Sequence, residues 1–278
     1  MTDWAPRTAL VTGASSGIGR GVALALAGKG VRVIAAARRI DALERLASES
    51  GGRITALKLD VTDDAQLRAL PERLGAFNAD VDLLVNNAGY AAAGPVEDVP
   101  LDEARRQFDV NLVGLIGVSQ AVVPAMRANR SGRIVNISSV AGVVSLPFLG
   151  IYCASKFAVE GLSDAMRLEL KPFGIYVCIA QPAAIASEFA NVTHDQARAP
   201  SDAYARWYRP DALRDASEAY AAPVDVAIAA IVEMCLSPIP KARLAFPARG
   251  RRMIAMQRLL PTRVFDGILA KRFRLHQI

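Results

Sequence analysis

The sequence predicts an α/β fold: a doubly wound parallel sheet of the Rossmann type, with seven strands and helices on both faces. Two observations predict this class. Short apolar runs alternate with longer segments of helical periodicity, and small or polar residues follow the ends of several runs. Strands that alternate with helices form parallel sheets through right-handed crossovers. Ligands bind outside the carboxyl ends of such strands, so the residues after each run are the candidate site residues.

Composition narrows the class of protein further. Of the 278 residues, 52% are hydrophobic, and no linker divides them, so we expect a single domain over residues 1–278. Neither a signal sequence nor an apolar run of about 18 residues, the length of a membrane span, is found, and a cytoplasmic protein is expected. Three scattered cysteines and two histidines predict neither a disulfide nor a metal site.

The positive charge is concentrated at one end of the sequence. The net charge is +6, but the residues from Lys241 onward carry ten Lys or Arg and the single acid Asp266. That segment therefore has a charge of +9, which leaves −3 for the preceding 240 residues. A basic tail of this kind does not predict a nucleic-acid-binding protein.

The first predicted strand, residues 8–12, leads into a glycine-rich loop, which a helix at 20–29 follows. Glycines let the backbone approach a pyrophosphate, whose charge is stabilised at the positive end of the helix. The spacing is G-x-x-x-G-x-G, and the alternative is an ordinary turn between strand and helix. The loop residues that we expect at a dinucleotide are Gly13, Ser15, Ser16, Gly17, Ile18 and Gly19.

The second predicted strand, residues 31–37, ends in Ala37 and is followed by Arg38 and Arg39. In a dinucleotide fold an acid at this position accepts hydrogen bonds from a free 2′-hydroxyl of the adenosine ribose. A guanidinium instead suits a 2′-phosphate. The two arginines therefore predict a preference for NADP(H) over NAD(H), and the alternative is that they only face solvent.

The remaining elements continue the alternation. Further strands are predicted at 54–59, 81–85, 133–138, 175–180 and 243–246, and further helices at 64–77, 101–129, 152–173 and 224–236. Asn86, Asn87, Ala88 and Gly89 follow the fourth strand, and such small or polar residues permit close packing against a ligand.

Three side chains near the fifth strand can form a proton-transfer unit. Tyr152 and Lys156 are four residues apart, so on a helix they share one face, and Ser139 directly follows the strand. A phenol is a poor acid or base at neutral pH, and a neighbouring ammonium is expected to lower its pKa. The serine hydroxyl can hold the same substrate oxygen.

Taken together, these motifs resemble those of the short-chain dehydrogenase/reductase family over about residues 7–190. The resemblance implies that Tyr152 is the general acid for carbonyl reduction, with Ser139 holding the substrate oxygen. It implies that Lys156 lowers the pKa of the tyrosine and binds the nicotinamide ribose, and that Asn111 interrupts its helix and anchors a water. The motifs that carry the resemblance are T-G-A-S-S-G-I-G at 12–19, Asp60-Val61, N-N-A-G at 86–89, Asn111, Ser139 and Y-C-A-S-K at 152–156.

The resemblance also implies the remaining cofactor contacts. Asp60 and Val61 would meet the adenine, Asn87, Ala88 and Gly89 would line the adenosine ribose, Pro182 and Ile185 would fix the carboxamide, and Ser187 would lie near the pyrophosphate. One position departs from the family pattern, because Ala183 stands where a glycine usually follows the proline. Its methyl group is expected to restrict the backbone, and with it to tilt the nicotinamide or narrow the crevice.

Two segments lie outside these motifs. Residues 186–222 form a long loop with five aromatic side chains, which predict either an apolar substrate or packing of the loop on its own domain. Residues 249–278 are basic and amphipathic, and Pro261 should divide them into two helices. Two interpretations of this extension are open: a segment that lies on a membrane surface, or a lid or dimer contact whose arginines face water. We favour the second, in which the extension packs against the protein.

The sequence thus predicts an NADP(H)-dependent oxidoreductase that reduces a ketone or aldehyde, or oxidises the alcohol in reverse, on a lipophilic substrate. The alternative is an NADP(H)-binding sensor or scaffold without turnover. An incomplete catalytic set would favour that alternative, and here Asn111, Ser139, Tyr152 and Lys156 are all present. Because the predicted helices at 101–129 and 152–173 resemble dimer surfaces of the family, a homodimer or homotetramer is expected.

Overall fold

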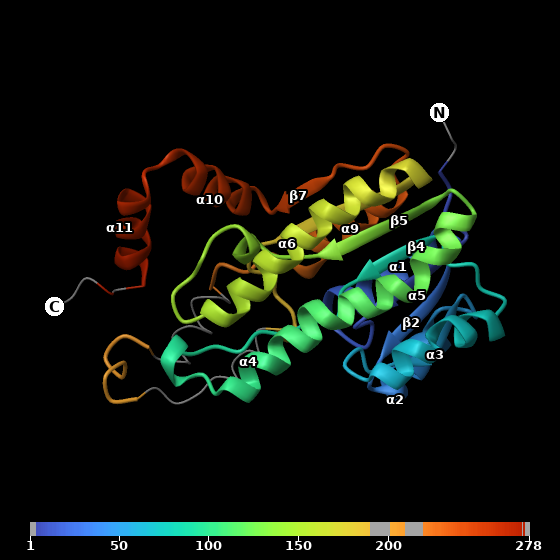
Figure 1. The fold of residues 1–278 in the computed structure, drawn as a ribbon, viewed down its shortest axis with the longest axis horizontal. Coiled ribbons are helices and arrows are strands. Elements are labelled where there is room, and N and C mark those ends of the chain that lie inside the picture. Colours follow the sequence, from blue (N-terminus) through green and yellow to red (C-terminus); the bar gives the residue numbers. More distant parts are fainter. Residues whose placement is uncertain (1–3, 190–200, 209–218, 274, 276–278) are drawn as a thin grey trace.

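The computed structural model describes residues 4–189, 201–208, 219–273 and 275. All seven predicted strands are present in one parallel sheet of order β3-β2-β1-β4-β5-β6-β7, which confirms the predicted fold class (Figure 1). The strands are β1 (Thr8–Thr12), β2 (Arg32–Ala37), β3 (Ile54–Lys58), β4 (Leu83–Asn86), β5 (Gly132–Ile137), β6 (Ile175–Pro182) and β7 (Arg243–Phe246). The strand order reverses between β1 and β4, and this switch point opens a crevice at their carboxyl ends.

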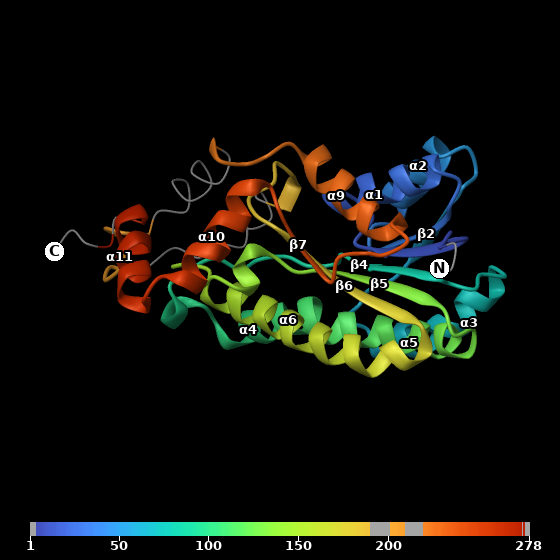
Figure 2. The ribbon, with the colours of Figure 1, turned by 90° about the horizontal axis from the view of Figure 1, so that it is seen from above.

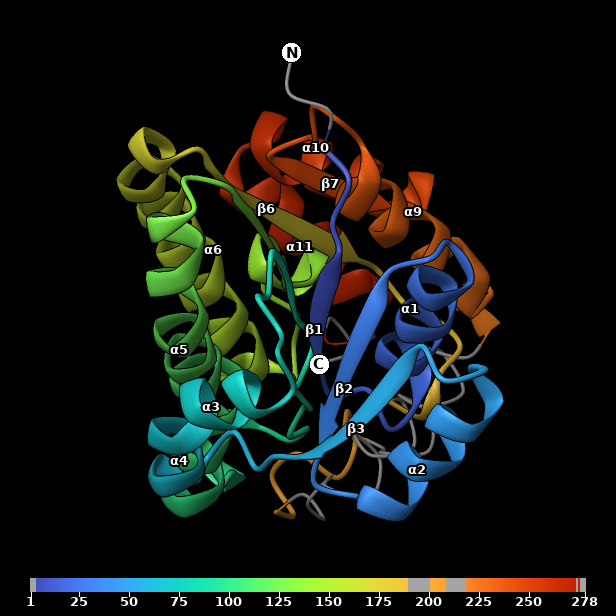
Figure 3. The same cartoon turned by 90° about the vertical axis from the view of Figure 1, so that its right-hand side faces the viewer.

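Helices cover both faces of the sheet. Figure 2 shows α1, α2 and α9 above it and α3, α4, α5 and α6 below it, and Figure 3 shows the same three layers end-on. The helices are α1 (Gly17–Gly28), α2 (Ile40–Glu49), α3 (Asp64–Ala76), α4 (Leu101–Phe108), α5 (Gly114–Ala128), α6 (Gly150–Leu170), α9 (Val224–Leu236), α10 (Ala248–Leu259) and α11 (Thr262–Arg272). Helix α2 is not among the predicted elements, and only Leu43 and Leu46 of its apolar stripe are buried.

Two apolar cores follow from the alternation of side chains along each strand. In β1, Ala9 and Val11 point into the upper core, which lies between the sheet and helices α1 and α9. Leu10 points into the lower core, which lies between the sheet and helices α3 and α5. Every residue of β1, β4 and β5 is buried, as expected of central strands covered on both faces.

The predicted helix at 101–129 is one helical run, Leu101–Ala128, whose hydrogen-bonding pattern changes in the middle. A π-helix at Asp109–Val113 separates α4 from α5 and contains Asn111. By length and composition alone the run Leu101–Ala128 could cross a membrane. In the fold it packs along the sheet, because Val118, Val122 and Met126 are buried in the lower core.

The C-terminal extension forms two helices, α10 and α11, with Pro261 between them as predicted. Their inward side chains Ile254, Phe265 and Leu269 form a third apolar cluster, together with Val140 and Val144 from the segment after β5. The extension is therefore packed against the segment that carries Ser139. Residues 190–200 and 209–218 of the predicted loop, and 274 and 276–278 of the extension, lie outside the described residues.

Candidate active site

The glycine-rich loop is joined to the end of β4 by reciprocal hydrogen bonds. Thr12 Oγ1 accepts from the backbone N–H groups of Asn87 and Ala88 at 3.0 and 3.1 Å. Asn87 Nδ2 donates to the carbonyl oxygens of Thr12 and Gly13 at 3.1 and 3.2 Å. A Cβ atom at Gly13 would lie 2.9 Å from Ala88 Cα, and one at Gly19 would overlap Asn87 Nδ2. Only glycine at both positions allows this close approach.

The loop and the first turn of α1 fit an anionic group such as a pyrophosphate. Gly13 and Gly17 have φ values of +63° and +53°, which glycine adopts without strain. The first N–H groups of a helix lack an intrahelical partner, and the N-cap residue Ser16 makes no side-chain capping bond that would occupy them. Ile18 packs against the upper core and anchors the turn. The residues present therefore fit a dinucleotide at the switch point between β1 and β4.

The two arginines after β2 are placed differently from one another. Arg39 donates from Nε and Nη2 to Ser15 Oγ at 3.2 and 3.1 Å, so its guanidinium lies on the glycine-rich loop. It also lies 3.6 Å from the Glu188 carboxylate. Arg38 is exposed. The geometry thus brings Arg39 to the glycine-rich loop.

Ser139 and Tyr152 lie on the same wall beyond the end of β5. Ser139 Oγ accepts from the N–H of Ala141 at 3.0 Å and donates to the carbonyl oxygen of Pro182 at 3.3 Å. Tyr152, in the first turn of α6, is only 8% exposed and lies in a small apolar cluster with Ala141. The Tyr152 ring lies 5.7 Å from that of Phe189, at the start of the long loop.

Lys156 lies one helical turn beyond Tyr152 and is buried. Its Nζ donates to the carbonyl oxygen of Ile137 at 2.9 Å and lies 5.9 Å from the centroid of the Tyr152 ring. Burial lowers the pKa of Lys156 to about 8, and the carboxylate of Glu160, one turn further along α6, opposes this effect. The ammonium is thus held at the strand end by a backbone carbonyl.

The expected lowering of the tyrosine pKa is not found in this structure. Burial raises the pKa of Tyr152 to about 12, and the hydrogen bond with the Ser139 side chain only partly offsets that effect. The physical reason is that burial desolvates the phenol, which disfavours its charged form. Tyr152 therefore keeps its proton at neutral pH, as a proton donor must.

Asn111 is buried in the π-helix, and its amide is fully engaged. Its Oδ1 accepts from the N–H of Tyr90, and its Nδ2 donates to the Tyr90 carbonyl oxygen and to Ser155 Oγ, each at 3.0 Å. A Cβ atom at Gly89 would lie 3.1 Å from Asn111 Oδ1 and 3.5 Å from Lys156 Nζ. Gly89, Asn111 and Lys156 therefore meet at one point next to the end of β4.

The residues predicted to contact the adenine also make contacts within the protein. Asp60 Oδ1 accepts from the N–H and the hydroxyl of Thr62 at 3.0 and 2.8 Å, so this carboxylate shapes its own turn. Val61 is buried in the lower core, and a Cβ atom at Gly114 would lie 2.8 Å from it. Both residues lie at the carboxyl end of β3, beside β2.

The residues after β6 lie near the glycine-rich loop and near the C-terminal helices. The backbone of Ile185 bridges to Ala222, and a Cβ atom at Gly17 would lie 3.6 Å from Ser187 Cβ. The Ala183 methyl group belongs to the cluster that holds the C-terminal helices, where a Cβ atom at Gly250 would lie 3.2 Å from it. The departure from the family pattern thus coincides with packing against α10.

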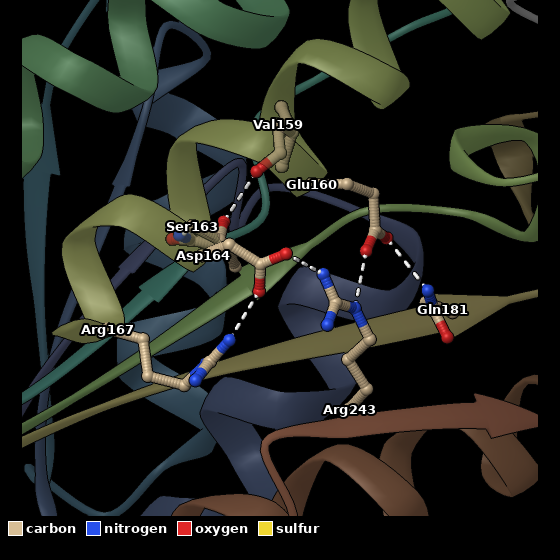
Figure 4. Close-up of polar contacts among 8 residues, drawn as sticks. Val159, Glu160, Ser163, Asp164, Arg167, Gln181 and Arg243 are labelled. Atoms are coloured by element: carbon tan, nitrogen blue, oxygen red, sulfur yellow. Dashed lines mark hydrogen bonds and ion pairs between the residues drawn. The ribbon is translucent and has the colours of Figure 1, made fainter.

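Figure 4 shows a polar network beneath the site whose residues were not predicted from the sequence. The buried Glu160 carboxylate accepts from Arg243 Nε of β7 and from Gln181 Nε2 of β6, each at 2.9 Å. Asp164 accepts from Arg243 and, at 2.7 Å, from Arg167. The only sequence signal for this network was the position of Glu160, four residues after Lys156 and so on the same side of α6. The partners of Glu160 lie far away along the chain and gave no signal.

An aromatic cavity of about 440 Å³ lies between the segment before α6, the long loop and the C-terminus. Its rings are in contact with neighbouring ones, since the centroid of Phe148 lies 4.9 Å from that of Tyr208 and 6.5 Å from that of Phe273. Among the described residues, Trp207 Nε1 and Tyr208 Oη are buried without a hydrogen-bond partner. The lining residues are Phe148, Tyr204, Arg206, Trp207 and Leu275.

Known proteins are similar to this chain in sequence. The family model described as short chain dehydrogenase matches residues 7–198. A probable short-chain type dehydrogenase/reductase, VdlC of Helicobacter pylori, is 33% identical over 94% of this chain and 95% of its own. The NADPH-dependent 3-dehydrocapnine reductase of Ornithobacterium rhinotracheale is 30% identical over 95% and 96%. The 3-ketodihydrosphingosine reductase of Bacteroides thetaiotaomicron is 40% identical over 64% and 63%.

Solved structures agree with the fold. A short-chain dehydrogenase from Streptomyces avermitilis has a TM-score of 0.82 and 32% identity, covering 99% of this chain and 100% of its own. A serine dehydrogenase complexed with NADP+ has a TM-score of 0.77 and 26% identity, over 87% and 95%. A short-chain dehydrogenase/reductase from Burkholderia phymatum in complex with NAD has a TM-score of 0.79 and 26% identity, over 93% and 94%.

The fold and the site define an oxidoreductase with a nicotinamide dinucleotide site. The match to the family model and the relatives that align over nearly the whole chain identify the group more closely. The chain belongs to the short-chain dehydrogenase/reductase family, as the motifs predicted.

Proposed function

We propose that this protein is an NADP(H)-preferring carbonyl reductase, reversible as an alcohol dehydrogenase, that acts on a lipophilic substrate. The observation that carries the proposal is the position of Tyr152. Its protonated hydroxyl is buried beside Ser139 and one turn from Lys156, whose ammonium lies next to Gly89 after β4. The bound cofactor supplies the hydride chemistry, and the side chains supply orientation and the proton.

Each side chain has a separate task. Ser139 Oγ, now donating to the Pro182 carbonyl, turns to the carbonyl oxygen of the substrate and holds it. Tyr152 donates its proton to that oxygen, because a phenol with a raised pKa is protonated at neutral pH. Lys156 remains positive below a pH of about 8 and stabilises the phenolate that is left. Asn111 fixes Gly89 and the neighbouring backbone around Lys156.

The preference for NADP(H) rests on charge. Arg39 lies on the glycine-rich loop, Arg38 is exposed beside it, and Ala37 stands where an acid would repel a 2′-phosphate. The relative named as NADPH-dependent spans nearly the whole chain and supports the same preference. Glu188 partly neutralises Arg39, and we expect a 2′-phosphate to displace this exposed pair.

The lipophilic substrate is inferred from the walls of the aromatic cavity and from the relative named for 3-ketodihydrosphingosine. The test is NADPH oxidation measured with a panel of ketones and aldehydes of increasing chain length, each repeated with NADH. We expect the ratio of kcat to KM to rise with apolar length and to favour NADPH. Equal rates for short and long substrates, or a preference for NADH, would contradict the proposal.

A further inference from the structure

The outer face of the C-terminal helices is both apolar and basic. The inward residues of α10 and α11 are already buried against the protein, whereas four large apolar side chains point outward. Met256, Leu259, Val264 and Ile268 are 39%, 81%, 50% and 39% exposed, respectively. Figures 1 and 2 place both helices at one end of the molecule, beyond the sheet. We call this surface the tail face.

Helical spacing gathers the apolar residues of the tail face into a stripe. In α10, Arg252, Met256 and Leu259 are four and three residues apart and therefore share one face. In α11, Val264 and Ile268 share a face in the same way. Scattered exposed apolar residues are normal on any protein, whereas here each of two consecutive helices exposes a pair of large apolar residues on one face, as a binding surface does.

Cations surround this stripe. Among the described residues of α10 and α11 there are seven Lys or Arg side chains and one acid, Asp266. Within the part of the chain that the structure describes, Arg252, Arg258 and Arg263 take part in no ion pair with an acid. The stripe thus combines unpaired positive charge with exposed apolar area, so its partner must be both negative and apolar.

We propose that the tail face docks on an anionic lipid bilayer. Amphipathic helices with this composition lie in the interface with their apolar residues among the acyl chains, while their arginines meet anionic headgroups. A second copy of the chain fits less well, because a two-fold interface would bring the same arginines opposite one another. The protein is attached peripherally, with its sheet outside the membrane.

The position of the aromatic cavity agrees with such docking. Leu275 lines this cavity, and the Phe273 ring, which follows α11 directly, contacts Phe148. One cavity wall is therefore continuous with the docking helices. The proposal does not depend on the reaction or the substrate, because it concerns only charge and apolar area on the surface.

The test measures flotation of the full chain with vesicles of phosphatidylcholine alone or of phosphatidylcholine with phosphatidylglycerol. We expect binding to the anionic vesicles, lowered by added salt. Arg252→Gln/Arg258→Gln should weaken the partition coefficient about 30-fold, since each cation contributes about 1 kcal/mol. The matched control is Arg45→Gln/Arg68→Gln, two exposed arginines on α2 and α3, which should leave binding unchanged.

The apolar contribution is tested separately with Leu259→Ser, which should weaken binding about tenfold. Ile239→Ser, at an exposed position before β7, is its control. Because all these side chains are exposed, thermal melting should show intact folding. The proposal is overturned by failure to bind anionic vesicles, by equal binding to both compositions, or by equal losses in the control variants. A change of sedimentation coefficient in Leu259→Ser without vesicle binding would assign the tail face to a second copy.

Discussion

Lys156 donates from Nζ to the carbonyl oxygen of Ile137 at 2.9 Å, which ties the first turns of α6 to the last residue of β5. The ammonium is therefore positioned by the sheet and not by the phenol that it is expected to assist. The same bond keeps a positive charge in a buried place, where Glu160 is the carboxylate that favours it.

The difference in the free energy of unfolding between the wild type and Lys156→Met should depend on pH, because the wild type buries a charged group and the variant does not. The pKa of Lys156 is about 8 in the folded protein and its ordinary value is 10.5, so between these values the unfolded chain binds more protons. The stability of the wild type then rises with pH relative to the variant, by about 2 kcal/mol between about pH 7 and pH 9.5. Urea unfolding at both pH values measures this, with the exposed Lys171→Met as control. A stability difference between wild type and variant that does not change with pH would contradict burial of the Lys156 charge as the cause.

Gly19→Ala should block cofactor binding and cost about 1–3 kcal/mol of stability, because the new Cβ overlaps Asn87 Nδ2 and crowds the Gly13 carbonyl. Gly28→Ala in the same helix meets no atom within 4 Å and should be neutral or stabilise by up to about 1 kcal/mol. Thermal melts and NADPH titration distinguish the two. Equal melting temperatures and equal NADPH affinities for both variants would contradict the close approach of Gly19 to Asn87.

Arg39→Gln should raise the Kd for NADPH about 10- to 100-fold and change that for NADH little, since a charge-assisted hydrogen bond contributes about 1.5–3 kcal/mol. Arg38→Gln should act in the same direction. Fluorescence titration with each cofactor measures the effect, and Arg45→Gln on α2 is the control for loss of a surface charge. A uniform loss for both cofactors would show that neither arginine reads the 2′-phosphate.

Arg243→Met should destabilise the protein by about 2–3 kcal/mol, because the buried carboxylate of Glu160 loses its cation. The effect is smaller than for a fully buried pair, since the Arg243 side chain is 32% exposed. Adding Glu160→Gln removes the unpaired charge and keeps a partner for Gln181, so most of the stability should return. If the double variant is no more stable than Arg243→Met, the network does not act through charge.

Local patterns were sufficient to predict the layered fold. The strands are mostly apolar runs, and the glycine-rich loop, the N-N-A-G segment and Ser139 each follow one, so the sheet brings Gly13, Asn87 and Ser139 to one edge. Helix α2 escaped prediction because only Leu43 and Leu46 mark its buried side. The π-helix could not be located by periodicity, although the family resemblance implied an interruption at Asn111.

Contacts between distant segments could not be predicted. Arg243 reaches Glu160 across 83 residues of chain, and nothing in either local sequence indicates the other. The raised pKa of Tyr152 depends on how completely the fold buries it, which spacing alone does not give. The position of Ala183 against Gly250 similarly depends on where α10 docks.

The most direct test of the central claim, that Tyr152 transfers the proton, is single-turnover oxidation of NADPH by Tyr152→Phe with a lipophilic ketone. Loss of a positioned acid should lower the rate about 10²–10⁴-fold while the Kd for NADPH stays unchanged, because the dinucleotide is held mainly by the glycine-rich loop. Tyr176→Phe, which alters an exposed tyrosine on β6, should retain full activity. A Tyr152→Phe enzyme that turns over at the wild-type rate would contradict the account.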